Sequence, residues 1–150
     1  MRARLNLGGN EIGDFGVIEL ALHVEHCPSL CHLGLSHNGI TDRGDSLLAL
    51  TLPRCPSLSI LELGVNNITG EGAGYLATVL PLCRLLSQLY LQNNRITGDD
   101  TLVFQDVLLH CPSLIYLSLS GNDMDLPTYI TMWGVGNTAG VRLDLKHTSV

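Results

Sequence analysis

The sequence has no long apolar run, few basic residues and no recognisable catalytic motif. None of its 150 residues lies in a stretch approaching the roughly 20 apolar residues that cross a bilayer, so no membrane contact is expected. Eight lysines and arginines stand against fourteen aspartates and glutamates, and this net charge of −6 argues against a nucleic-acid partner. The first residues do not have the pattern of a signal peptide, and five cysteines are an odd number. These absences favour a reducing compartment, and the expected location is cytoplasmic.

Leucine is what the sequence has in excess, at 30 of 150 residues, and its spacing is regular. A segment of the form L-x-x-L-x-L-x-x-N occurs four times, at residues 30–38, 58–66, 86–94 and 114–122. Its middle leucine steps by 28 residues, through Leu5, Leu33, Leu61, Leu89 and Leu117. A sixth, Leu143, follows after 26 residues. Recurrence at a fixed period predicts a solenoid of stacked units.

Within each unit the apolar period changes partway. Alternating leucines predict a strand with one buried face. Thr41, Thr69 and Thr97 then begin segments in which apolar residues fall four apart, as on one side of a helix of about three turns. Each unit is therefore predicted to be a strand, a turn, a helix and a return loop.

Stacking such units produces curvature. Neighbouring strands lie about 4.8 Å apart, whereas packed helices need about 8–10 Å. The helices must therefore form the convex side and the parallel strands the concave side of an α/β horseshoe.

A repeated asparagine follows each strand, at residues 10, 38, 66, 94 and 122. A carboxamide donates and accepts hydrogen bonds, so each is predicted to satisfy backbone groups of its own turn and of the adjacent one. The asparagines are interpreted as scaffold.

The unit L-x-x-L-x-L-x-x-N-x-I-T-x-x-G, with its 28-residue period and C-P-S-L return loop, resembles the ribonuclease-inhibitor class of leucine-rich repeats. The resemblance implies a single leucine-rich-repeat domain over residues 1–150, with regular repeats at about 5–122. Residues 123–150 are predicted to be an irregular terminal repeat. Pro127, Trp133 and several glycines break the helical pattern between residues 123 and 142.

Two short motifs resemble ligand sites. Cys27 and Cys31, flanked by His26 and His32, have the look of a zinc site. Cys27 instead shares a repeat position with the cysteines at 55, 83 and 111, which predicts a ladder of small buried thiols. The glycines of residues 70–74 lie between a strand and a helix, but no Lys-Ser/Thr follows them. No metal and no cofactor are expected.

A binding surface can be predicted from the strands, because residues between the leucines must face the concave side. Large side chains gather near its centre. This central patch consists of His32, Ile60, Glu62, Gln88, Tyr90, Gln92 and Tyr116. Two tyrosines among small residues are candidate energetic centres of an interface.

The sequence thus predicts a module that binds a protein partner of unknown identity and has no catalytic residue. One alternative is a structural segment of a longer array, whose exposed edges would also allow self-association. Another, implied only by resemblance to the Ran GTPase-activating protein, is a regulator of a small GTPase, although no residue here is singled out for that activity.

Overall fold

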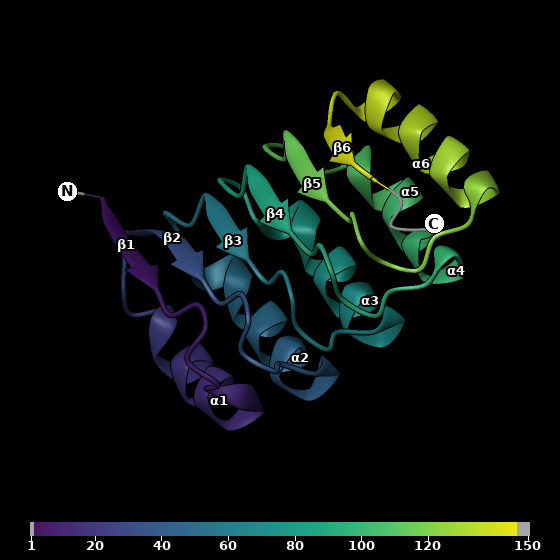
Figure 1. Ribbon diagram of the computed structural model, residues 1–150. Coiled ribbons are helices and arrows are strands. Elements are labelled where there is room, and N and C mark those ends of the chain that lie inside the picture. The colour runs from purple at the N-terminus through teal and green to yellow at the C-terminus, as the bar shows by residue number, and fades with distance from the viewer. Residues whose placement is uncertain (1, 147–150) are drawn as a thin grey trace.

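The computed structural model describes residues 2–146 and contains six parallel strands in one sheet, ordered along the chain (Figure 1). The strands are β1 (Ala3–Asn6), β2 (Leu30–Gly34), β3 (Ile60–Glu62), β4 (Gln88–Tyr90), β5 (Tyr116–Ser118) and β6 (Arg142–Asp144). Each strand pairs with the next one in sequence, and Leu33, Leu61 and Leu89 are direct neighbours in the register. The predicted α/β solenoid is therefore confirmed.

Helices cover one side of the sheet and leave the other open (Figure 1). They are α1 (Gly13–Val24), α2 (Asp42–Thr51), α3 (Gly70–Val79), α4 (Gly98–Thr101), α5 (Val103–Leu108) and α6 (Leu126–Ala139), with 3-10 turns at Leu52–Arg54 and Leu80–Leu82. Thr41, Thr69 and Thr97 are the N-caps of α2, α3 and α4, as predicted. In the fourth unit the helix is interrupted at Leu102. Within residues 2–146, no helix combines the length and apolar character that a membrane crossing requires.

The core lies between the sheet and the helices, and it repeats with the sequence. In the second unit Leu33, Leu35, Ile40 and Leu48 are fully buried, and the equivalent residues of the third unit are buried in the same way. Leu20 of α1, which corresponds to Leu48, is only half-buried. Burial of the same leucines in successive units makes one continuous apolar core.

The repeated asparagines link neighbouring units as predicted. The Asn66 amide nitrogen donates to the Leu63 carbonyl of its own unit, at 2.9 Å, and to the Leu35 carbonyl of the preceding one, at 3.1 Å. Its Oδ1 accepts from the backbone N–H groups of Asn38 and Ile40, at 3.0 and 3.1 Å. Each side chain thus satisfies buried backbone groups that would otherwise be left without partners.

The terminal unit contradicts one prediction, because the segment expected to lose its helix forms α6. Asp125 is the N-cap, and its Oδ1 accepts from the Thr128 N–H at 2.9 Å. Pro127 lies in the first turn, where a helix needs no amide donor, so it does not disrupt the helix. Gly136 is buried against Leu143, and a side chain there would collide with it. The helix ends at Gly140, whose φ of 71° is left-handed.

Carboxylates on one helix also cap the next. Oδ1 of Asp42 accepts from the backbone N–H of Thr69, at 2.8 Å, and of Gly72, at 3.0 Å. Its Oδ2 accepts from the Thr69 hydroxyl at 2.6 Å. Asp14 makes the same contacts with Thr41 and Gly44 one unit earlier. Each carboxylate therefore satisfies helix donors that have no partner within their own helix.

In the cap of α4, the aspartate and the glycine have exchanged positions. Gly70 stands where Asp42 is expected, and Asp100 stands where Gly72 is expected. Asp100 accepts from the Thr97 N–H and hydroxyl, at 2.9 and 2.7 Å, and its carboxyl group occupies the space that a side chain on Gly70 would need. The cap is thus supplied from within the helix instead of from the preceding unit.

A buried carboxyl group lies in the first turn of α2. Asp45 has no solvent exposure, and neither of its oxygens hydrogen-bonds to the described protein. Equivalent residues are Val17, Ala73 and Thr101. Burial raises the pKa of Asp45 well above its ordinary range, and the nearby Asp42 carboxylate raises it further. The ionised form is therefore disfavoured in the folded protein.

The exchanged cap predicts energetic coupling between residues 70 and 100. Asp100→Gly alone should destabilise the chain by about 1 kcal/mol, because the Thr97 donors lose their carboxylate. In a Gly70→Asp background the same change should cost little, since the introduced carboxylate restores the arrangement of Asp42 and Gly72. Urea unfolding of the wild type, both single variants and the double variant measures this coupling; additive effects would contradict it.

The raised pKa of Asp45 predicts that the free energy of unfolding falls as pH rises. Its folded-state pKa is raised, so its destabilising effect is absent below the pKa of the unfolded chain, about 4, and grows as pH rises through the folded-state pKa. At neutral pH Asp45→Ala should stabilise the protein by about 1–3 kcal/mol, and this difference should shrink on acidification. Asp45→Asn separates charge from size, and Asp106→Ala, at an exposed carboxylate, is the control. A difference that does not change with pH would exclude this interpretation.

Candidate interaction surface

The strand register arranges the concave side chains in columns. In one column His32, Ile60, Gln88, Tyr116 and Arg142 are successive neighbours. A second column runs Gly34, Glu62, Tyr90, Ser118, Asp144. All seven residues of the central patch are half-buried. The structure therefore brings them together on one face, as the alternation of the strands predicts.

Tyr90 and Tyr116 form an aromatic pair at the middle of this face. Their ring centroids are 5.1 Å apart and the rings are tilted by 48°. The Tyr90 hydroxyl donates to Oε1 of Gln88 at 2.9 Å, which fixes its ring. Burial raises the pKa of Tyr90, with smaller contributions from Tyr116 and Glu62, so this hydroxyl stays protonated at neutral pH. A held pair of rings presents apolar area at little entropic cost.

On the N-terminal side of the tyrosines lies a histidine–carboxylate contact. Nε2 of His32 is 2.8 Å from Oε1 of Glu62, and both side chains are partly buried. Nδ1 of His32 is buried and makes no hydrogen bond within residues 2–146. The patch thus combines an apolar centre with polar groups whose hydrogen-bonding capacity is not fully used.

Gln92 extends the patch across a glycine. A side chain on Gly64 would collide with the Gln92 amide, so Gly64 leaves room for this group to lie flat on the sheet. Oε1 of Gln92 is buried and has no hydrogen-bond partner in the described chain. Gly64 therefore makes room for the Gln92 side chain beside the other residues of the patch.

Sequence reasoning did not select Arg142 and Asp144, which border the tyrosines on the C-terminal side. The Arg142 guanidinium lies 6.0 Å from the Tyr116 ring centroid, and Asp144 accepts hydroxyl contacts from Ser118 at 3.3 Å and Ser120 at 3.2 Å. Both residues flank Leu143, at strand positions that the sequence predicts to face the concave side. Their contacts became apparent only from side-chain geometry.

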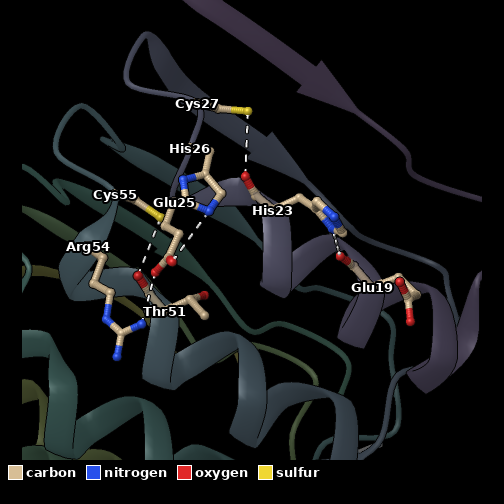
Figure 2. Close-up of polar contacts among 8 residues, drawn as sticks. All are labelled: Glu19, His23, Glu25, His26, Cys27, Thr51, Arg54 and Cys55. Carbon is tan, nitrogen blue, oxygen red and sulfur yellow. Dashed lines mark hydrogen bonds and ion pairs between the residues drawn. The ribbon is translucent and has the colours of Figure 1, made fainter.

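The cysteine–histidine motif does not form a shared site. Sγ of Cys27 approaches the His23 carbonyl at 3.9 Å, whereas His26 contacts Glu25 at 3.7 Å (Figure 2). Cys31 is buried in β2, and His32 faces the concave side. Among residues 2–146, no three histidine, cysteine or acidic side chains are placed to hold a metal ion.

The predicted thiol ladder is confirmed for its inner members. Cys55 and Cys83 are buried, Cys111 is half-buried, and Cys27 in the first unit is exposed, which corrects the prediction at that position. Burial, with smaller effects from Cys55 and Cys111, raises the pKa of Cys83 to about 12. Such thiols stay neutral and serve as packing groups.

The glycines of residues 70–74 do not form a phosphate-binding loop. They belong to the first turns of α3, and its N-terminal donors are already bound by Asp42 and Thr69. An anion at this helix terminus would have to displace a carboxylate of the chain itself.

One position at the rim of the concave face carries backbone strain. The residue before each repeated asparagine has a positive φ, and in the third unit it is Val65, at 54°. The equivalent residue in the fourth unit is Asn93, also at 54°, a type that tolerates this conformation. A β-branched side chain there is unfavourable.

Strands on a concave face, helices on the convex face and asparagine ladders between units define a repeat solenoid. The leucine-rich repeat family model matches residues 4–21, 26–49, 54–77 and 110–126, which together make up more than half of the chain. The chain therefore belongs to the leucine-rich repeat family. No curated protein sequence matches it.

Solved structures agree on the fold. The actin-binding site 2 of leiomodin-1 superposes with a TM-score of 0.76 at 17% sequence identity, over 91% of this chain and 79% of that one. The tropomodulin C-terminal domain of Caenorhabditis elegans gives a TM-score of 0.77 at 13% identity, over 92% and 84% of the two chains. At these identities the similarity is one of fold.

The strain at Val65 predicts that Val65→Asn stabilises the protein by about 1 kcal/mol, because asparagine adopts a left-handed conformation more readily. The reverse change, Asn93→Val, should destabilise it by a similar amount. Urea unfolding of both variants provides the comparison, and a loss of stability in Val65→Asn would show that contacts of the valine outweigh its strain.

Proposed function

We propose that this chain is a cytoplasmic protein-interaction module that binds its partner on the concave face and carries out no catalysis. The observation that supports this most is the central patch. Six of its seven residues lie on the adjacent strands β2–β5, and Gln92 follows β4. All seven are half-buried, and the packed pair Tyr90 and Tyr116 is at the middle of the patch. Aromatic side chains surrounded by polar groups are typical of the energetic centre of an interface.

The composition of the face supports the same proposal. The two columns that the register defines hold twelve residues over six strands, and residues that follow the strands, such as Gln92, enlarge the face towards the roughly 20–30 residues on one side of a standard interface. Small residues near the tyrosines allow a partner's backbone to approach closely. Gln92 and His32 place polar side chains beside the tyrosines, as at the border of an interface.

The related folds suggest a first candidate to test. The leiomodin-1 domain is, by its name, an actin-binding site. We therefore include actin as a defined ligand beside an unbiased search for partners. At 17% identity, the shared fold alone does not assign actin as the partner of this chain.

Self-association through the solenoid edges is the second candidate. Within residues 2–146, β1 and β6 each pair with only one neighbouring strand. Unpaired edges are sites of strand addition. Sedimentation over a range of concentrations distinguishes edge stacking, which gives oligomers, from a concave-face interaction with a different protein.

The concave-face proposal predicts that Tyr90→Ala together with Tyr116→Ala abolishes partner capture without altering the fold. We expect a loss of affinity of at least about a hundredfold, as for two central interface aromatics. Affinity capture from a lysate of cells that express the protein, and titration with purified actin, measure the effect.

The matched control replaces two exposed aromatics on the helical side, Phe15→Ala with Tyr75→Ala. This variant should capture the same protein as the wild type, and circular dichroism should show an unchanged fold for both. Capture that survives the Tyr90/Tyr116 change would place the binding surface elsewhere.

A further inference from the structure

A groove runs along the C-terminal end of the solenoid, between α6 and the outer edge of β6. Its volume is about 410 Å³, and its lining includes Tyr129, Trp133, Arg142, Leu143 and Lys146. A second hollow of about 350 Å³ continues along Trp133 and Leu143 towards Gly140. In Figure 1 this end of the sheet lies beside α6 and beyond β5.

The backbone of β6 has an open edge. The Arg142 N–H donates to the Ile115 carbonyl at 2.9 Å, and the Asp144 carbonyl accepts from the Leu119 N–H at 2.8 Å. These groups face β5. Because peptide groups alternate along a strand, those of Leu143 and Leu145 face the groove. No strand within residues 2–146 pairs with them.

Side-chain size at this end of the solenoid differs from that in the first three units. Ala21, Ala49 and Ala77 share one helix position, and all are buried, which allows the next helix to pack closely. In α6 the same position is Trp133, whose exposed fraction is 57%. Tyr129 likewise stands where Val17 and Ala73 stand in other helices.

Tyr129 and Trp133 instead line the groove beside β6. Within residues 2–146 the outer edge of β6 has no paired strand, so an extended segment has room to lie along it. Trp133 and Leu143 would then cover one face of that segment.

Charge is distributed unevenly across the groove. Arg142, Asp144 and Lys146 alternate with the leucines and so share the concave side. Asp144 is already contacted by two serine hydroxyls. Arg142 and Lys146 form no ion pair with any residue between 2 and 146. Two cations of a chain with net charge −6 are therefore free to bind an anionic group.

We propose that this groove binds an extended segment of another protein, which adds to β6 as a seventh strand. Its side chains must alternate, with apolar residues against Trp133 and Leu143 and carboxylates against Arg142 and Lys146. The main chain would pair with Leu143 and Leu145. The groove shares Tyr116 with the central patch but does not include Tyr90, so a Tyr90 variant distinguishes this proposal from the concave-face proposal.

A capped peptide, acetyl-Asp-Leu-Ser-Leu-Asp-amide, is the direct probe. Its sequence reads the same in both directions, so it presents carboxylates to Arg142 and Lys146 in a parallel or antiparallel orientation. Trp133 is the only tryptophan, and its fluorescence reports on the groove without a label. We expect saturable binding with a blue shift of the Trp133 emission.

Three peptide controls isolate the three requirements. Replacing both aspartates by lysine tests charge, replacing both leucines by serine tests the apolar contacts, and N-methylation of the backbone tests strand pairing. Each should weaken binding by at least about tenfold. An unmodified peptide that does not bind, or an N-methylated one that binds equally well, overturns the proposal.

Protein variants complete the test by calorimetry. Trp133→Ala copies the residue found in α1–α3 and should lose binding while keeping the fold, whereas Tyr90→Ala should bind the peptide as the wild type does. Peptide binding that appears only after residues 147–150 are removed would identify the chain's own end as the occupant and contradict the proposal. Concentration-dependent self-association that Trp133→Ala abolishes would identify a second copy and also contradict it.

Discussion

The structure depends on a difference in spacing between its two layers. Neighbouring strands lie about 4.8 Å apart, and helices pack at about 8–10 Å even with small residues between them. Ala21, Ala49 and Ala77 share one helix position and are all buried, and small residues at such positions favour close packing of helices. The same constraint bends the sheet and leaves its concave face free of helices. An open face built on adjacent strands is thus a consequence of helix packing.

The contacts that hold one unit to the next are polar as well as apolar, and they cross the boundary at fixed offsets. Each repeated asparagine satisfies turns in two units, and Asp14 and Asp42 cap the helix that follows. Where the cap residue is missing, at Gly70, a carboxylate from Asp100 takes its place and fills the space that the glycine leaves. The backbone N–H groups at the start of each helix therefore need an acceptor, and it matters less which residue supplies that acceptor.

Most of the fold could be predicted from sequence because each signal occurs five times, so chance departures in one unit are outweighed by the others. The terminal unit has no such redundancy, and Pro127 and the glycines of α6 were misjudged from composition when their positions in the helix permit them. The concave columns followed from strand alternation alone. The contacts of Arg142 and Asp144, the strain at Val65 and the isolation of Asp45 depend on side-chain packing and torsion angles, which periodicity does not encode.

The helix position that carries Ala21, Ala49 and Ala77 in α1–α3 carries Trp133 in α6. In α1–α3 this residue is small and buried, whereas in α6 it is an exposed tryptophan that lines the groove beside β6, whose outer edge has no paired strand within residues 2–146. An uncovered edge usually invites uncontrolled pairing, and charged side chains beside it reduce that tendency. Arg142 and Lys146 repel strands that bring cations and attract strands that bring carboxylates. In the proposed complex, the residues around β6 thus determine which strands its edge accepts.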